Sequence, residues 1–421
     1  MATASNGRAG QYALVRKNVR TFFPKPLPPN PSIRLGDEYV DALAAAERNM
    51  GRLDGVATAL PDADLFVYMY VRKEAVLSSQ IEGTQSTLVD LLEYEAGADL
   101  HTPEQDVGEV ANYVSALNHG IEQLRLPREL SLDLIRESHR KLLEGVRGGD
   151  YEPGIFRDDE VWIGFEGCSI EEADFVPPPA AEVPRLMAEL ETFIRSPSPL
   201  PLLTRAGLMH AQFETIHPFY DGNGRLGRML VSLLLTKEGA LSKPVLYLSH
   251  YFRRHRTEYC AKLQAVRDIG DWESWIVFFL KGVAEVADQA TETAHRIANL
   301  REENRSEIQT LMGGRAGKAL MLLEGLFAKP IVSVRDVRRI TQTAFPTANS
   351  LVSALESLGI LREITGQRHY RRFAYRPYID ILTEEDHADG DSHRSIPTTN
   401  SPREQSGPAK VTKTRITAER S

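Results

Sequence analysis

The sequence predicts a mainly α fold, built as a helical bundle with one β-hairpin and followed by a small α+β module. Three observations support this prediction. Apolar residues recur at helical spacing along most of the chain, one short segment replaces that spacing with β-prone runs and Gly turns, and the composition changes after Gly313 and Gly314. Because the chain has 421 residues, of which 42% are hydrophobic, it can bury more than one core.

The helical spacing places the individual helices. We expect helices over residues 39–53, 65–81, 88–94, 107–124, 132–143, 183–194, 202–216 and 224–238, and further helix from 251 to about 311. Between residues 151 and 179 the pattern breaks, and we expect a small hairpin there.

Changes in pattern also divide the chain into segments. We expect an extended, docked arm over residues 1–31, a helical region over 32–125, a second helical region with the hairpin over 126–311, the α+β module over 313–382, and a disordered tail over 383–421. The arm is rich in Gly, Pro and basic residues, and the tail has little to bury.

Charge and cysteine content limit the possible environments. The net charge of −8 argues against wholesale coating of nucleic acid. Two cysteines, Cys168 and Cys260, cannot make a disulfide framework, and we find no signal peptide and no apolar run of membrane-spanning length. We therefore expect a cytoplasmic protein without membrane contact.

The segment HPFYDGNGRLGR, residues 217–228, lies between two apolar helical runs and so forms a loop that opens into a helix. Gly222 and Gly224 allow a tight turn and a close approach of backbone N–H groups to an anion, which the positive end of the helix also favours. Arg225 and Arg228 add two cations that can hold different phosphates of one polyphosphate. The segment is therefore predicted to bind a polyphosphate.

Two further side chains of this segment predict chemistry at the phosphates. Asp221 supplies a hard oxygen ligand suited to Mg²⁺ held jointly with phosphate, and His217 can take a proton from an incoming hydroxyl. A lone His before a Pro is more often a packing or capping residue. The combination of base, metal ligand, glycines, Asn223 and two arginines has little reason to arise from packing.

These twelve residues resemble the signature of the Fic family, and every defined position of that signature matches. The resemblance implies a Fic helical bundle in which His217 deprotonates a Ser, Thr or Tyr hydroxyl of a target protein. The hydroxyl then attacks the α-phosphate of ATP. It also implies that Asp221 holds Mg²⁺ and that the nucleotide is bound by Asp221, Gly222, Asn223, Gly224, Arg225, Leu226, Gly227 and Arg228.

Two other stretches fit the resemblance. The run from Val161 through Trp162 and Ile163 to Gly164 is similar to the family's flap, a hairpin that aligns the target segment by strand-like pairing; a plain surface hairpin is the alternative. Tyr259 and Cys260 occupy the place where relatives line the adenine pocket, and Tyr259 is expected to stack there. An aromatic on a helix is, however, more often part of the core.

An earlier stretch, VLSSQIEGTQST, resembles the family's inhibitory motif. Ser78 and Glu82 are four residues apart and share a helix face, and Gly83 ends the helix. The resemblance implies that Glu82 forms an ion pair with Arg228 and so occupies the cation that the γ-phosphate needs. The alternative is an ordinary solvated glutamate near a helix end.

The α+β module is basic. Residues 313–378 contain eleven Lys and Arg and four Asp and Glu, a net charge of +7. We interpret it as a winged helix, in which Arg368, Arg371 and Arg372 could contact DNA phosphates and Thr347, Asn349 and Ser350 could face a groove. A module that binds protein is the alternative.

The function predicted from these features is transfer of AMP from ATP to a protein hydroxyl, the chain's own included, under inhibition by Glu82. One alternative is a nucleotide-sensing regulator that binds DNA through the winged helix. Another is a Fic transferase that moves a different phosphate-containing group. A homodimer is possible, since homodimers are common among relatives.

Overall fold

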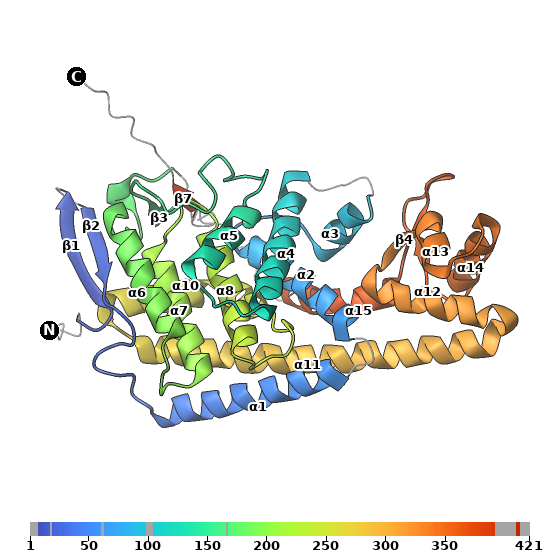
Figure 1. The fold of residues 1–421 in the computed structure, drawn as a ribbon, viewed down its shortest axis with the longest axis horizontal. Helices are drawn as coiled ribbons and strands as arrows, with labels where there is room; N and C mark the ends of the chain where they lie inside the picture. The colour runs from blue at the N-terminus through green and yellow to red at the C-terminus, as the bar shows by residue number, and fades with distance from the viewer. Residues whose placement is uncertain are drawn as a thin grey trace, which may run out of the picture.

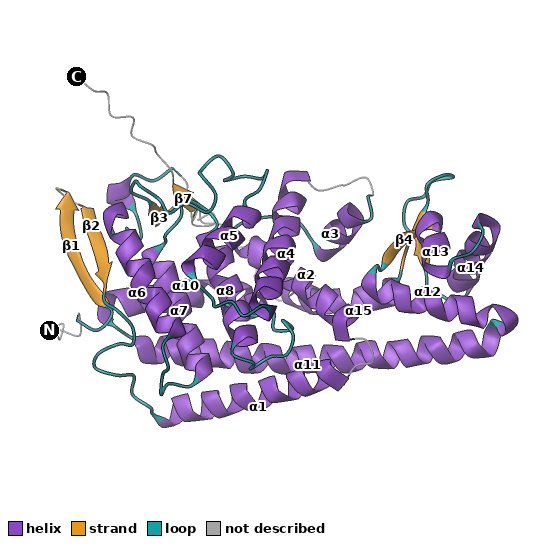
Figure 2. Cartoon of the chain, viewed as in Figure 1, coloured by secondary structure: helices purple, strands orange, loops and turns teal. Residues whose placement is uncertain are grey.

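The computed structural model describes residues 7–16, 19–59, 63–97, 104–165, 167–391 and 410–412. The chain is mainly helical, which confirms the predicted fold class (Figures 1 and 2). The helices of the first part are α1 (Asp37–Ala59), α2 (Ala63–Ile81), α3 (Leu88–Glu95), α4 (Glu104–Arg125), α5 (Leu132–Leu142), α6 (Val183–Arg195), α7 (Leu202–Ile216) and α8 (Asn223–Lys237). They are followed by α9 (Ser249–Arg254), α10 (Arg256–Ile269), α11 (Trp272–Leu311), α12 (Ala316–Ala328), α13 (Val334–Thr341), α14 (Phe345–Ser357) and α15 (Arg376–Asp391).

Three small antiparallel sheets accompany the helices. Their strands are β1 (Gly10–Arg16), β2 (Val19–Pro24), β3 (Trp162–Gly164), β4 (Ile331–Ser333), β5 (Arg362–Glu363), β6 (Arg372–Ala374) and β7 (Lys410–Thr412). The sheets are β1-β2, β3-β7 and β4-β6-β5.

Helices α7 and α8 form the centre of the bundle. Every residue of α7 from Leu203 to Ile216 is buried, and α8 is buried from Asn223 to Leu235 except at Gly224. Helices that are buried all round need neighbours on every side, and α7 and α8 pack against each other and against α4, α5, α6 and α11. The segment between them is therefore fixed from both ends.

The 40-residue helix α11 runs along one side of the molecule, and α1 packs lengthwise against it (Figure 1). Its first half covers the bundle, with Trp275 and Phe279 fully buried. Its second half reaches the C-terminal module, where α12 turns back along it. This one helix connects the bundle to the module.

The N-terminal arm is docked as predicted, but it is a two-stranded hairpin in its described residues. β1 pairs with β2 from Gly10 opposite Pro24 onward. Phe22 is fully buried, and its N–H donates to Val176 O at 3.1 Å. The Gly and Pro content gave no indication of this pairing.

The C-terminal module has the predicted three helices followed by two strands, here α12, α13, α14, β5 and β6. Strand β4, between α12 and α13, was not predicted, and it pairs with β6. The interpretation as a winged helix remains a prediction.

The structure describes two segments within the predicted tail. α15 continues to Asp391, and β7 pairs with β3 at the other end of the molecule (Figure 1). The other residues of the predicted tail lie outside the described residues.

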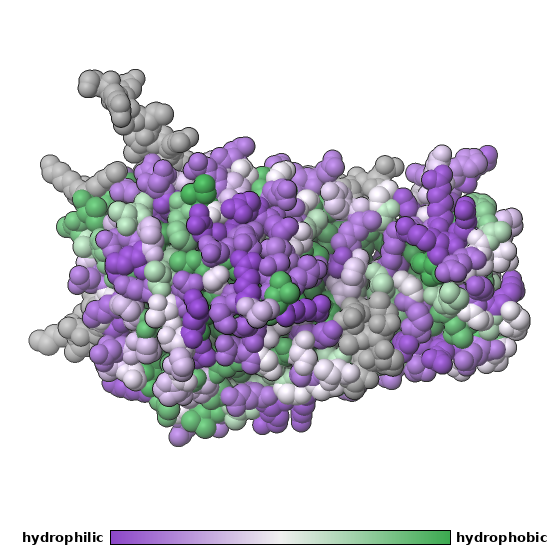
Figure 3. Space-filling view, viewed as in Figure 1, coloured by the Kyte–Doolittle hydropathy of each residue, from purple (hydrophilic) through white to green (hydrophobic). Residues whose placement is uncertain are grey.

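Within the described part of the chain, no helix is both long and apolar enough to cross a membrane. Hydrophilic side chains cover most of the face seen in Figure 3.

Candidate active site

The loop between α7 and α8 is held in one conformation by its own residues. His217 ends α7 in the left-handed region, with φ +49°, and its N–H donates to Phe213 O at 2.9 Å. Gly222 has φ +75°, a value that favours glycine. The Asn223 side chain closes the loop, because its Oδ1 accepts from Phe219 N at 2.9 Å and its Nδ2 donates to Phe219 O at 2.8 Å.

His139, which the sequence analysis did not single out, supports this loop from α5. Its ring stacks on Phe219 at 3.7 Å, its Nδ1 accepts from Gly154 N at 2.8 Å, and its Nε2 lies 2.9 Å from Asp221 O. Since Nδ1 accepts, the proton is on Nε2 and is donated to Asp221 O. Burial lowers the pKa of His139 to about 4, so this tautomer persists at neutral pH.

The α8 N-terminus opens directly from this loop. Its N-cap, Gly222, has no side chain to satisfy the first N–H groups of the helix, and such groups together with the helix dipole favour an anion. The anion present there is the carboxylate of Glu82. A Cβ at Gly224 would lie 2.2 Å from Glu82 Oε1, so a glycine is needed at this position for the carboxylate to approach the first turn of α8.

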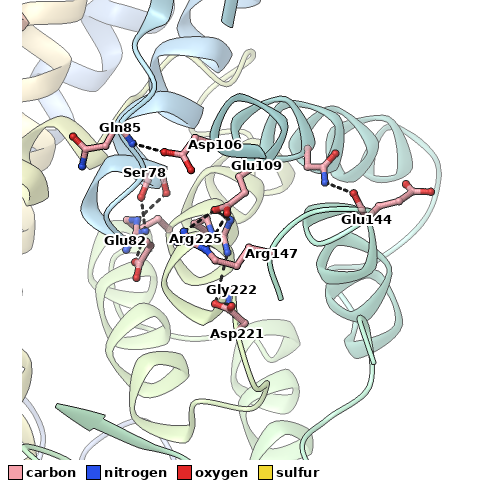
Figure 4. A network of polar contacts seen from close by, with 12 residues as sticks. Ser78, Glu82, Gln85, Asp106, Glu109, Glu144, Arg147, Asp221, Gly222 and Arg225 are labelled. Carbon is pink, nitrogen blue, oxygen red and sulfur yellow. Dashed lines mark hydrogen bonds and ion pairs between the residues drawn. The ribbon is translucent and has the colours of Figure 1, made fainter. Parts of the chain in front are cut away.

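Arg228 is held by two residues at the end of α2, Ser78 and Glu82. Figure 4 shows these two residues near Arg225. Arg228 Nε donates to Ser78 Oγ at 2.9 Å, and Arg228 Nη2 donates to Ser78 O at 2.9 Å and to Glu82 Oε1 at 2.8 Å. The Arg228 side chain is 2% exposed and that of Glu82 is 37% exposed. The predicted ion pair is therefore present, with the arginine buried and the glutamate partly exposed.

Electrostatics keep Arg228 charged. Burial alone would lower the pKa of Arg228, but the charges of Glu82 and Glu214 contribute to a net rise. A permanently charged guanidinium in a dry site interacts strongly with any carboxylate or phosphate that reaches it.

Two more carboxyl groups lie near Arg228, and the sequence gave no sign of either. Glu74 of α2 accepts from Ser249 Oγ at 2.5 Å, from Ser249 N at 3.1 Å and from Tyr113 at 3.2 Å. Glu214 of α7 lies against Gly227, where a Cβ would be 2.5 Å from its Oε1. Burial raises the pKa of each carboxyl to about 7. Both are therefore partly protonated at neutral pH.

The raised pKa of Glu214 predicts a pH-dependent stability difference. Its folded pKa of about 7 lies above the unfolded value, so its favourable contribution is complete below about pH 4.5 and is lost as pH rises through 7. Glu214→Gln, which stays neutral, should match the unmutated chain at pH 4. At pH 8 it should be more stable by about 3 kcal/mol. Urea unfolding at the two pH values measures this, and an equal difference at both would contradict it.

Arg225 is buried between Glu109 and Asp221, whose Oδ1 lies 3.7 Å from its Nη2. Its side chain is 2% exposed, and its Nη1 lies 2.9 Å from Oε2 of Glu109, a fully buried residue of α4 (Figure 4). Arg147 also contacts Glu109, at 3.1 Å. The sequence did not indicate that Glu109, in the middle of a helix, would pair with these two arginines. In this arrangement Arg225 stabilises the start of α8, which does not favour the predicted direct contact with phosphate.

Asp221 is the candidate Mg²⁺ ligand. Its Oδ1 accepts from Gly222 N at 2.7 Å, and its side chain is 25% exposed. Among the described residues, no cluster of three or more His, Cys, Asp or Glu could hold a metal by itself. One partly exposed carboxylate next to a phosphate site fits Mg²⁺ that is shared with a nucleotide.

His217 is buried, and in the described structure both of its ring nitrogens lack a hydrogen-bond partner. Buried polar atoms are normally paired, so two unpaired nitrogens indicate a place for a ligand. Burial, with the nearby charges of Arg157 and Arg267, lowers the pKa of His217 to about 3. The imidazole is therefore neutral and able to accept a proton.

The predicted flap lies beside this histidine. Arg157, which precedes β3, donates from Nε to His217 O at 2.9 Å and from Nη2 to Pro178 O at 2.5 Å. Val161 and Trp162 are buried, and Trp162 Nε1 donates to Cys168 O at 3.0 Å. Ile163 pairs with Phe175 on the returning segment, so a small hairpin is present as predicted.

Tyr259 lies in the core. It is 4% exposed, its ring stacks on Phe252 at 4.5 Å, and its hydroxyl lies 2.7 Å from His210 Nε2. A ring so enclosed offers little face to a base, so the geometry does not favour the predicted stacking on adenine. Cys260 is exposed.

The predicted DNA contacts in the C-terminal module differ in accessibility. Thr347, Ser350 and Arg368 are exposed. Arg372 instead donates to Gly97 O at 2.9 Å, so it is directed toward the end of α3. Arg371 and Asn349 lie 3.5 Å apart along a cavity of about 760 Å³.

Comparisons with known proteins agree with this architecture. Residues 40–122 match the Fic/DOC family N-terminal region, and residues 129–235 match the Fic/DOC family itself. Two consecutive regions of this chain are therefore similar to the two parts of the Fic/DOC family.

Curated relatives are similar over part of their length. A probable protein adenylyltransferase of Aquifex aeolicus (strain VF5) is 28% identical over 182 residues, 42% of this chain and 51% of the relative. Protein adenylyltransferase Fic of Drosophila virilis is 35% identical over 113 residues, 26% of this chain and 21% of the relative. The match thus spans about half of the first relative and about a fifth of the second.

A solved structure of a Fic family protein from Desulfovibrio desulfuricans G20 has a similar fold. The TM-score is 0.52 at 19% sequence identity, over 81% of this chain and 97% of that one. This similarity extends the fold assignment beyond the two matched family regions.

Proposed function

We propose that this protein transfers AMP from ATP to a hydroxyl group of a protein, its own chain included. The observation that carries the proposal is a buried, neutral His217 with two unpartnered ring nitrogens, in the loop that leads into the α8 N-terminus. A base without a partner next to an anion-binding helix end suits the attack of a hydroxyl on a phosphate. The names of the curated relatives support the choice of AMP.

In the proposed transfer, His217 acts on the acceptor hydroxyl, and α8 and Arg228 act on the phosphates. A ring nitrogen of His217 accepts the proton of the acceptor hydroxyl, and the oxygen forms a bond to the α-phosphorus. The bond from that phosphorus to the bridging oxygen breaks, and pyrophosphate leaves with the electron pair. The first N–H groups of α8 and the guanidinium of Arg228 bind phosphate oxygens.

Asp221 would hold Mg²⁺ together with the phosphates, and the metal would supply positive charge to the phosphate oxygens. Asn223 acts on the loop rather than on the nucleotide, because both polar atoms of its side chain bond Phe219. Arg225 acts in the same way through Glu109.

We also propose that Glu82 inhibits the transfer. Its carboxylate lies 2.8 Å from Arg228 Nη2 and against Gly224, where a terminal phosphate would bind. Two anions cannot share one guanidinium without repulsion, so ATP binds productively only when Glu82 moves away. At 37% exposure the carboxylate has solvent to move into.

The position of the label after transfer tests the reaction. We expect the purified chain, incubated with ATP and Mg²⁺, to retain label from the α-phosphate and none from the γ-phosphate. Retained γ-label alone would identify a kinase. If neither label is retained, even by Glu82→Gly, the chain is not an AMP transferase under these conditions and the proposal fails.

Contact with DNA, a homodimer and a cytoplasmic location remain predictions from the sequence. A regulator that only senses nucleotide would give salt-sensitive duplex binding and no covalent label.

A further inference from the structure

Strand β3 of the flap has two edges, and both are paired. On one edge, Ile163 N donates to Phe175 O at 2.9 Å and Phe175 N donates to Ile163 O at 3.1 Å. On the other edge lies β7, with Trp162 opposite Thr412, Ile163 opposite Val411 and Gly164 opposite Lys410. The second strand comes from the C-terminal end of the chain, beyond α15, which lies in another part of the molecule (Figure 1).

The edge that β7 covers belongs to a hairpin tied to the candidate base. Arg157 bonds the carbonyl of His217 and also that of Pro178, just beyond the returning segment at Phe175. Both sides of the hairpin are therefore held against the His217 loop. An extended segment that pairs with β3 is consequently fixed in position relative to the histidine.

Pairing with an exposed strand edge is a general way to bind an extended peptide, because the main chain supplies the hydrogen bonds whatever the sequence. The resemblance to the family's flap already implies that a target segment pairs with this hairpin. We propose that residues 410–412 of this chain occupy the outer edge of β3 in cis and so exclude other extended protein segments. This inference rests on the proposed function, because it names what competes with a protein target at the same site.

Two properties favour the binding of residues 410–412 to β3: the residue types of this region and its covalent link to the same chain. Val411, Thr412, Thr414, Ile416 and Thr417 are β-branched, and such residues favour strands. A segment of the same chain also binds intramolecularly, so its effective concentration at β3 does not depend on the protein concentration. A target segment in solution would have to exceed that concentration or bind more tightly.

The register of β7 on β3 allows two proline variants to be compared, one that removes a hydrogen bond to β3 and one that does not. Because the polar groups of Ile163 face Phe175, those of Trp162 and Gly164 face β7, since successive residues of a strand alternate. Lys410, opposite Gly164, therefore directs its N–H toward β3, and Val411 directs its N–H away. Lys410→Pro removes a donor from the ladder, whereas Val411→Pro removes one that the ladder does not use.

Amide hydrogen exchange at Trp162 and Gly164 tests whether residues 410–412 pair with β3. In the full chain and in Val411→Pro we expect slow exchange. In Lys410→Pro and in a chain that ends at Asp391 we expect exchange at least about tenfold faster, as ladder protection is lost. Equal exchange in all four chains would overturn the proposal. This readout does not require transfer from ATP, so its failure and a failure of the proposed function can be told apart.

Binding of a synthetic peptide tests the competition. A fluorescein-labelled peptide of residues 405–421 should bind the chain that ends at Asp391, with a rise in fluorescence anisotropy. It should bind the full chain at least about tenfold more weakly, because the tethered segment already holds the edge. Lys410→Pro should restore binding to the full chain. Equal binding to the full and shortened chains would show that residues 410–412 exclude nothing.

Discussion

Glu82→Gly is expected to raise the transfer of α-label from ATP by roughly 5- to 150-fold, the range of typical coupling between two sites. The reason is the position of the carboxylate, 2.8 Å from Arg228 Nη2 and in contact range of Gly224. Without this carboxylate, Arg228 keeps its hydrogen bonds to Ser78. The Nη2 atom that bonds Glu82 becomes available to a phosphate oxygen. Initial rates of self-labelling at fixed ATP and Mg²⁺ measure the effect.

Two control variants show whether the rate increase comes from the lost charge of Glu82. They separate this cause from a change in side-chain volume and from the loss of an ion pair elsewhere. Glu82→Gln keeps the shape and removes the charge, so its rate should lie between those of the unmutated chain and Glu82→Gly. Glu285→Gln removes a carboxylate of similar exposure that lies 3.2 Å from Arg254, and its rate should not change. Equal rates for Glu82→Gly and the unmutated chain would exclude inhibition by this residue.

His217→Ala is expected to lower transfer by about 10²- to 10⁴-fold, the usual contribution of general acid–base catalysis. The measurement is best made in the Glu82→Gly background, where the rate is high enough to follow a large loss. The imidazole bonds no described residue through its ring, so its removal breaks no hydrogen bond of that ring. Nucleotide affinity should therefore stay within about threefold, since the phosphates bind elsewhere in the loop.

His119→Ala is the matched control for this loss. His119 is a partly exposed histidine of α4 that lies 3.3 Å from Glu137, and its replacement should leave the rate unchanged. If His217→Ala retains full transfer, the proton is taken by another group and the proposed role of His217 is wrong.

The helices could be predicted from the sequence because their signals are local. Predicted helices over 65–81, 88–94 and 202–216 correspond to α2, α3 and α7, where apolar spacing, Gly83 and Pro201 mark the ends. The ion pair of Arg228 with Glu82 was predicted as well, although from a resemblance rather than from spacing. The local sequence pattern around each residue does not predict a contact between two residues that lie 146 positions apart.

Contacts between distant segments explain the features that local pattern did not predict. Residues 410–412 have few apolar neighbours in sequence, so a disordered tail was expected, and only the open edge of β3 makes them a strand. Tyr259 was expected to stack on adenine, yet Phe252 and His210 enclose its ring. The partners of Arg225 could not be predicted for the same reason, because Glu109 gives no local signal.

The sequence by itself determined the helical bundle and the twelve residues that contain a candidate base, a candidate metal ligand and a glycine-rich turn, because periodicity and glycine placement are local properties of the chain. The tertiary structure decided which charges meet. It turned Arg225 toward Glu109, set Glu82 against Arg228 and buried His217, whose ring nitrogens have no hydrogen-bond partner among the described residues. Burial and pairing of charges depend on what surrounds them in space, and the order of residues does not specify those surroundings.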